Sequence, residues 1–310
     1  MAFEPAYLKT HESGELARRA GAATAAMASC SLCPRRCGVD RLAGETGVCR
    51  TGRRAWVASY DPHFGEEAPL VGSRGSGTIF FTHCNLMCVF CQNWEISHGG
   101  AGRAVSDKAL GEMMLRLQEM GCHNINFVSP SHVVAQILSA LPTAIEGGLR
   151  IPLVYNSGGY DRVETLKLLD GVVDIYMPDF KFWNETLAEK TCDAPDYPEA
   201  ARKALREMHR QVGDLDTGED GLARRGLLVR HLVLPNGIAD TGEIMGFLAR
   251  EISEDTYVNI MPQYRPRGRS GAFPELAGYP SKSDVQAATA AAKRAGIHRL
   301  DQRRRVFMRG

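Results

Sequence analysis

The sequence predicts an α/β fold, and two observations lead to this prediction. From residue 78 onward, short apolar segments rich in β-branched and aromatic residues recur, each of a length that suits one buried strand. Between them lie longer segments with the apolar spacing of amphipathic helices. This alternation requires a parallel sheet whose strands are joined by right-handed helical crossovers. The strand candidates are Thr78–Thr82, Ile125–Val128, Pro152–Tyr155, Val172–Tyr176, Leu227–Leu234 and Tyr257–Met261.

The helix candidates are supported by their ends and by their apolar faces. Ser106 is a favourable N-cap for a helix over Ser106–Met120, and Gly121 directly follows its last residue. In Thr241–Ile252 the apolar residues recur at helical spacing. The remaining candidates are Ser131–Ala144, Asp161–Leu169 and, before the first strand, the alanine-rich segment Ala20–Ser29. Periodicity alone also allows a doubly wound open sheet.

Charge and cysteine content limit the classes of partner and compartment. Lys plus Arg number 37 against 36 Asp plus Glu, so the net charge of +1 gives no general attraction to nucleic acid or to an anionic membrane. No stretch has the apolar length of a membrane span. Nine cysteines without a secretion signal indicate a reducing compartment, and we expect a cytoplasmic protein. The basic run at residues 303–305 is expected to be a solvated tail or a helix end.

Three closely spaced cysteines follow the first strand candidate. Cys84, Cys88 and Cys91 have the spacing C-x3-C-x2-C. A zinc site or an ordinary ferredoxin site uses four protein ligands, whereas three thiolates on a 4Fe–4S cube leave one iron open to an outside molecule. The alternatives are a zinc knuckle or three incidental buried thiols. Cys122 and Cys192 are remote in sequence from both cysteine groups.

A second cysteine group precedes the sheet. Cys30, Cys33, Cys37 and Cys49 are separated by turn-forming glycines and a proline, which suits a loop wrapped around one metal. Four soft ligands fit zinc or a second iron–sulfur cluster, and spacing alone does not decide between them. Thiols that are only structural or redox-labile remain the alternative.

The cluster loop, with Phe90 just before its last cysteine, resembles that of the radical S-adenosylmethionine (SAM) superfamily. The six strand–helix units resemble its partial (β/α)6 TIM-like barrel. The resemblance implies two parts. Residues 1–77 form a small N-terminal extension that consists of a helix and a cysteine-rich knuckle. Residues 78–310 form the barrel, followed by a C-terminal helical extension. It also implies a 4Fe–4S cluster whose open iron binds SAM. The charged, glycine-rich segment Gly213–Gly226 is then expected to be a mobile loop over the barrel mouth.

Within the superfamily, the chain resembles pyruvate formate-lyase activating enzyme and its uncharacterised homologues. The segment Met177 to Lys181 is similar to that family's Met-Leu-Asp-Leu-Lys, and Gln92–Asn93 to its polar pair after the cluster. The resemblance implies a catalytic role for Lys181 and cofactor contacts for Phe90, Asn93, Asp179 and Arg230. Two segments depart from the family pattern, and their polar groups are expected to bind the cofactor instead: Ser129, Ser131, Asn156 and Ser157.

The expected function is reductive cleavage of SAM to a 5'-deoxyadenosyl radical, which abstracts hydrogen and activates a glycyl radical enzyme. The alternatives are radical modification of another protein, peptide or small molecule, and a non-catalytic iron–sulfur or zinc protein that transfers electrons. The expected partners are an unidentified protein or small-molecule substrate and a flavodoxin- or ferredoxin-type reductant. Neither nucleic acid nor a membrane is expected as a partner.

Overall fold

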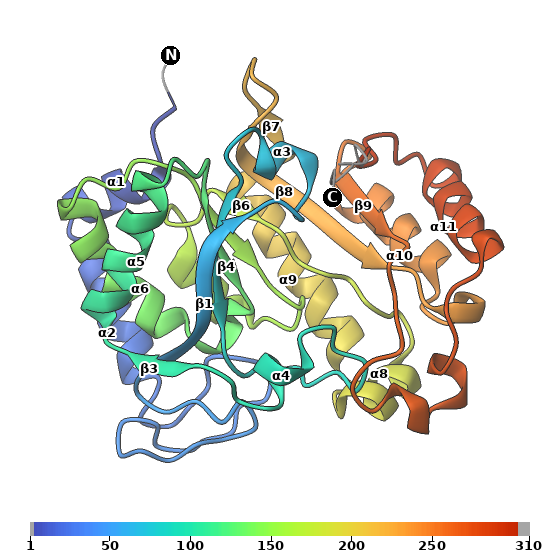
Figure 1. Ribbon diagram of the computed structural model, residues 1–310, viewed down its shortest axis with the longest axis horizontal. Helices are drawn as coiled ribbons and strands as arrows, with labels where there is room; N and C mark the ends of the chain where they lie inside the picture. The colour runs from blue at the N-terminus through green and yellow to red at the C-terminus, as the bar shows by residue number, and fades with distance from the viewer. Residues whose placement is uncertain (1–2, 303–310) are drawn as a thin grey trace, which may run out of the picture.

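The computed structural model describes residues 3–302, and the basic run at 303–305 lies outside them. The fold is α/β, as predicted, with a mostly parallel open sheet. Six parallel strands lie side by side in chain order, and helices cover the outer face of the sheet (Figure 1). A doubly wound sheet would reverse its strand order partway along, so this alternative is wrong. The parallel strands are β2 (Ser76–Phe81), β4 (Ile125–Val128), β5 (Leu153–Asn156), β6 (Ile175–Tyr176), β8 (Ala223–Leu232) and β9 (Tyr257–Met261).

Three antiparallel strands extend the sheet. β1 (Ala55–His63) pairs antiparallel with β2, and β3 (Arg103–Val105) pairs with the other edge of β1. The predicted boundary at residue 78 falls inside β2, whose neighbour β1 belongs to the same sheet. The sheet does not close into a full barrel: β3 and β9 are its edges, consistent with a partial TIM-like barrel.

The loop predicted over Gly213–Gly226 is in a different place. Its residues form a hairpin in which β7 (Asp216–Thr217) pairs antiparallel with the start of β8. This hairpin therefore lies at the amino end of β8, near α3 (Ala68–Val71) in Figure 1, and opposite the carboxyl ends where the cluster loop begins. Glycine and charge are equally typical of a hairpin turn, which is why the prediction was wrong.

Each predicted helical segment contains a helix, although the bounds differ. The helices in or overlapping these segments include α2 (Glu15–Ala25), α5 (Asp107–Glu119), α6 (Val134–Glu146) and α10 (Thr241–Phe247), and α1 (Ala6–Glu12) and α11 (Lys282–Arg294) lie near the two ends of the described chain. Ser106 caps α5 by accepting from the Ala109 amide, as expected. The segment predicted as Asp161–Leu169 shortens to α7 (Val163–Leu166) and a 3-10 turn. Sequence reasoning missed α8 (Glu185–Cys192) and α9 (Tyr197–Val212), although α9 has buried residues at helical spacing.

Two apolar clusters fill the fold. The larger lies between the outer face of the sheet and its covering helices. The smaller lines the inner face near the amino ends of the strands, where Leu70 of α3 packs against Val154, Ile175 and Leu228. Because α3 fills this end, the polar inner side chains lie towards the carboxyl ends of the strands, and the candidate site is found there.

His231 shows how a polar group is satisfied within the larger cluster. Its Nδ1 lies 2.8 Å from the carbonyl oxygen of Phe180, and its Nε2 lies 2.8 Å from Oγ1 of Thr241. The carbonyl can only accept, so Nδ1 donates and Nε2 accepts from the hydroxyl. Burial lowers the pKa of His231 to about 4, so the ring is neutral and structural.

This burial predicts a pH-dependent stability. Because the folded pKa of His231 is below the unfolded value of 6.5, its stabilisation is present above pH 6.5 and is lost as the pH falls towards about 4. Between pH 7 and pH 5 the free energy of unfolding should fall by about 2 kcal/mol through this residue. Chemical denaturation of wild type and His231→Gln at both pH values should show the smaller pH dependence in the variant. Equal pH dependences would contradict the assignment.

Candidate active site

The cluster loop begins directly after β2 and carries Cys84, Cys88 and Cys91. Two residues of this loop, His83 and Met87, have left-handed backbone conformations, with φ of 72° and 57°. The tight path is held by backbone hydrogen bonds, including one from the Cys91 amide to the Cys88 carbonyl. Burial raises the pKa of the Cys84 thiol to about 12. The sequence therefore places three free thiols at the carboxyl end of the first parallel strand, as predicted.

A fourth thiol, Cys192, also lies at this loop. The neighbouring thiol of Cys192, to which the protonated Cys88 thiol can donate, is the largest cause of the raised pKa of Cys88, ahead of burial. Cys192 is the last residue of α8, and the carbonyl of neighbouring Thr191 accepts from the Val89 amide of the cluster loop. The sequence reasoning treated Cys192 as isolated from both cysteine groups, which is wrong. Helix α8 brings it back across more than one hundred residues of chain, and no local pattern reveals that contact.

Asp179 binds two cations at the carboxyl edge of the sheet. Its Oδ1 accepts from Nε of Arg230 at 2.8 Å, and its Oδ2 accepts from Nζ of Lys181 at 2.5 Å. Burial alone would raise the pKa of Asp179, but the two cations hold this pKa below its usual value. Burial would lower the pKa of Lys181, but Asp179 and Cys88 raise it, so Lys181 stays charged beside the cluster loop. The sequence named all three charged residues, and the structure brings them together.

Each guanidinium nitrogen of Arg230 lies near a side-chain oxygen of another residue. Besides Asp179, its guanidinium donates to Oδ1 of Asn156 at 2.7 Å and lies 3.5 Å from a carboxylate oxygen of Glu66. Glu66 and its neighbour Glu67 are buried inside the sheet, and Glu67 accepts from the Asn259 side chain at 2.6 Å. The sequence analysis did not identify this acidic pair. Two adjacent carboxylates are typical of solvent-exposed turns, so the sequence carried no signal for them.

The serine candidates surround Asp161. Oγ of Ser157 donates to Asp161 at 2.6 Å, and the Tyr155 hydroxyl donates to its other oxygen at 2.8 Å. Ser131 also contributes a hydrogen bond to this carboxylate, whose pKa burial raises overall. Ser129 has a left-handed φ of 59°, and its amide donates to the Asn156 carbonyl. Asp161 was expected to begin a helix, so its position between two predicted site residues was missed.

Phe90 and Asn93 flank the last cluster cysteine in different surroundings. Phe90 is buried and packs against the rings of Phe182 and Tyr264. Asn93 is exposed at the start of α4 (Trp94–Ser97). Beside it, the Gln92 amide donates to the Arg265 carbonyl at 2.9 Å, which joins the first and last loops of the parallel sheet.

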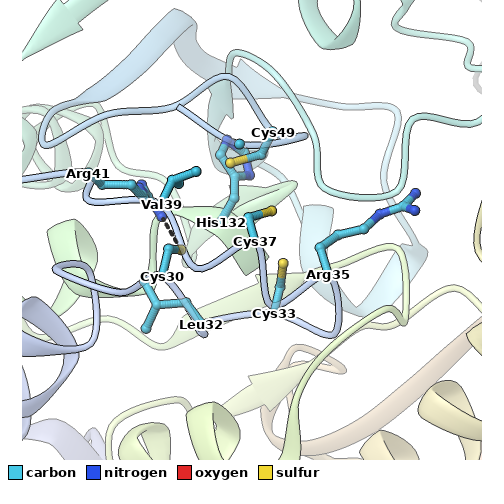
Figure 2. A pocket seen from close by; sticks show the side chains of 10 residues that line it. Cys30, Leu32, Cys33, Arg35, Cys37, Val39, Arg41, Cys49 and His132 are labelled. Carbon is cyan, nitrogen blue, oxygen red and sulfur yellow. Dashed lines mark hydrogen bonds between the residues drawn. The ribbon is translucent and has the colours of Figure 1, made fainter. Parts of the chain in front are cut away.

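The second cysteine group lines one pocket (Figure 2). Cys30, Cys33 and Cys49 are buried and Cys37 is partly exposed. Among the residues that the structure describes, no three Cys, His, Asp or Glu side chains are close enough to hold a single metal ion as they stand. A cluster separates its thiolate ligands further than one ion does, and rotation about χ1 moves a thiol sulfur without moving the backbone. By type and number, three free thiols in one loop and four around one pocket fit soft metal centres.

The structure is an open α/β barrel with three thiols and buried cations at its carboxyl edge. This combination of fold and site is typical of a metal-dependent enzyme. Residues 78–217 match the model of the Radical SAM superfamily. An uncharacterised protein of Methanocaldococcus jannaschii is 32% identical over 255 residues, which cover 80% of this chain and 69% of that protein. The chain belongs to the radical SAM superfamily. It is therefore a radical SAM enzyme, and a 4Fe–4S cluster and SAM are the cofactors of that class.

A solved structure is similar in fold only. HydG, a maturase of the FeFe-hydrogenase, superposes with a TM-score of 0.49 at 14% sequence identity. The match covers 72% of this chain and 50% of the HydG chain, so this chain spans half the length of that protein. Within residues 3–302, no helix is both long and apolar enough to cross a membrane.

The Asp179 ion pairs predict a large loss of stability when its charge is removed. Asp179→Asn keeps the shape of the side chain but leaves Arg230 and Lys181 without their shared anion. We expect the free energy of unfolding to fall by roughly 3 to 5 kcal/mol, the usual cost of breaking a buried pair. Chemical denaturation measures this change.

The matched control is Asp220→Asn, which removes the same charge from an exposed pair with Arg224. Exposed pairs contribute little, so its effect should stay below about 1 kcal/mol. Similar losses in both variants would mean that burial adds nothing to the Asp179 pairs.

Proposed function

We propose that this chain uses Cys84, Cys88 and Cys91 to hold a 4Fe–4S cluster with one open iron, and that it cleaves SAM reductively there. The observation that carries the proposal is the position of these thiols. They lie at the carboxyl end of the first parallel strand, with the charged Lys181 close enough to influence both Cys88 and Cys91. When bound, the cofactors supply one electron to the SAM sulfonium, which breaks a C–S bond and leaves a 5'-deoxyadenosyl radical.

The charged side chains have separate roles in this proposal. Lys181 is the catalytic group in this proposal. Its ammonium has three N–H donors, and only one of them is used on Asp179. It can therefore donate to a bound carboxylate and remain paired. Arg230 positions Asp179, since its own nitrogens already face Asp179, Asn156 and Glu66. This replaces the direct carboxylate contact that the sequence reasoning gave to Arg230.

The remaining candidates shape the cofactor site in the proposal. Phe90 supports the cluster loop through its aromatic contacts. Asn93 and Ser129 supply polar groups at the loop ends, and Asn156 orients Arg230. The hydroxyls of Ser131 and Ser157 are already bonded to Asp161, so they hold that loop in place.

The proposed substrate is a glycine backbone of a partner enzyme, from which the radical abstracts hydrogen. The similarity of the cluster loop and of Met177 to Lys181 to pyruvate formate-lyase activating enzyme supports this choice. Radical modification of another protein, peptide or small molecule is the alternative within the same class. A flavodoxin- or ferredoxin-type protein is proposed as the reductant, and the cytoplasm as the compartment, because the chain carries nine cysteines without any disulfide in the described residues.

One observation favours a second function. Because Cys192 lies near enough to Cys88 to raise the pKa of that thiol, four thiols are available near the cluster loop. If Cys192 is a cluster ligand, no iron is open and the centre only transfers electrons. A test of the proposal must therefore separate a three-thiol cluster from a four-thiol cluster.

The proposal predicts the product of SAM cleavage. The anaerobically reconstituted, reduced protein should form 5'-deoxyadenosine from SAM, measured by chromatography. Cys88→Ala should lower the product at least 100-fold and reduce the iron content by one cluster. Cys122→Ala, which changes a buried cysteine near neither group, should change neither quantity.

Cys192→Ala decides between the two functions. A three-thiol cluster keeps its iron and its product formation in this variant. A wild type that is fully loaded and reduced yet inactive, together with a Cys192→Ala variant that loses iron or gains activity, would establish electron transfer instead.

A further inference from the structure

The loop that carries the second cysteine group is held around the pocket in Figure 2 by its own backbone hydrogen bonds. The Cys30 amide donates to the Val39 carbonyl, and the Gly38 amide donates to the Cys30 carbonyl, so two arms of the loop pair beside the pocket. A Cβ on Gly47 would lie 2.6 Å from Sγ of Cys37. Glycine is therefore required where the chain passes this thiol, and the loop is built closely around the cysteine side chains.

Arg41 is a buried cation in this loop without a carboxylate. It is 1% exposed, although arginine is almost never fully buried unless it is paired. Its guanidinium donates to the Gly52 carbonyl at 3.1 Å and lies 3.8 Å from Sγ of Cys30. Among the described residues, no Asp or Glu oxygen lies within 4.0 Å of it. A buried positive charge of this kind requires a nearby anion, and the thiolate form of the cysteines is the one at hand.

His132 is a second buried group with an unmet requirement. It is 1% exposed and lines the same pocket. Its Nε2 lies 3.0 Å from the Thr82 carbonyl and must donate to it, so Nδ1 carries a lone pair. No donor for this lone pair exists among residues 3–302. An unpaired buried cation and an unpaired buried acceptor thus face the same four thiols.

We propose that Cys30, Cys33, Cys37 and Cys49 bind a soft metal centre as thiolates, and that Arg41 neutralises part of the negative charge of that centre. Four thiolates around a zinc ion or around an iron–sulfur cube carry a net negative charge, which supplies the anion that Arg41 lacks. The thiol side chains turn towards the pocket when the metal binds, because as they stand they do not share one ion.

This second centre also supports the cluster loop, a consequence that rests on the proposed function of that loop. Arg35, between Cys33 and Cys37, donates to the carbonyls of Asn85 at 3.0 Å and Leu86 at 3.3 Å. It also donates to the Cys192 carbonyl at 2.6 Å. A metal that fixes Cys33 and Cys37 therefore fixes the arginine that holds the segment between Cys84 and Cys88.

Metal content tests the proposal independently of SAM cleavage. The full chain with Cys84, Cys88 and Cys91 changed to Ala is purified anaerobically, and its iron, zinc and sulfide are measured by elemental analysis. We expect about one centre per chain to remain. Iron with sulfide identifies a cluster, and zinc without sulfide identifies a single ion. Changing Cys30, Cys33, Cys37 and Cys49 to Ala as well should remove this metal.

The role of Arg41 is tested in the same background. Arg41→Met keeps the length of the side chain and removes its charge, so a chelator should strip the metal at least tenfold faster. Arg41→Lys should restore part of the retention, and Arg18→Met, at an exposed position, should have no effect. If Arg41→Met fails to fold, thiol alkylation of the Arg41-containing protein still decides: the four cysteines should be protected until the metal is chelated. Absence of metal, metal that persists when all four cysteines are changed to Ala, or unprotected thiols would overturn the proposal.

Discussion

Asp179 lies between Lys181 and Arg230, and the polar edge of this sheet depends on that arrangement. Two cations are buried where the strands end, and each would be strongly destabilising without an anion. Arg230 then extends the contact to Asn156 on β5 and to Glu66 on the segment before α3. One carboxylate thus links strands that are far apart in sequence.

The same edge carries the cluster loop because parallel strands end on one side of a sheet. The loop after β2, the residues after β6 and the carboxyl end of β8 therefore meet without any of them being near in sequence. Lys181 is charged beside Cys88, so the proposed cluster would have a counter-charge next to it. Arg35 adds the cysteine-rich segment to this assembly through the carbonyls of the cluster loop.

Features with a local cause could be predicted from the sequence. The strand alternation, the Ser106 cap and the cysteine spacing each depend on residues a few positions apart, and the structure has the corresponding elements. Asp179, Lys181 and Arg230 were identified by similarity of short segments. Their ion pairs could not be, because pairing across β6 and β8 depends on register, which the sequence does not display.

Tertiary contacts account for what was missed. Glu67 is buried just before α3 by contacts with distant parts of the chain, and Cys192 reaches Cys88 through α8. The hairpin of β7 and β8 has the composition of a mobile loop, and strand pairing alone places it at the opposite end from the site. In each case the local sequence was typical of a surface segment.

The central claim is that one iron of the cluster held by Cys84, Cys88 and Cys91 has no protein ligand. Electron–nuclear double resonance of the reduced protein with SAM labelled with nitrogen-15 at its amino group measures this directly. The account predicts a nitrogen-15 coupling to the cluster, of equal size in wild type and in Cys192→Ala. No coupling in the fully loaded wild type, with a coupling that appears only after Cys192 is removed, would show that the fourth thiol occupies the iron and would contradict the claim.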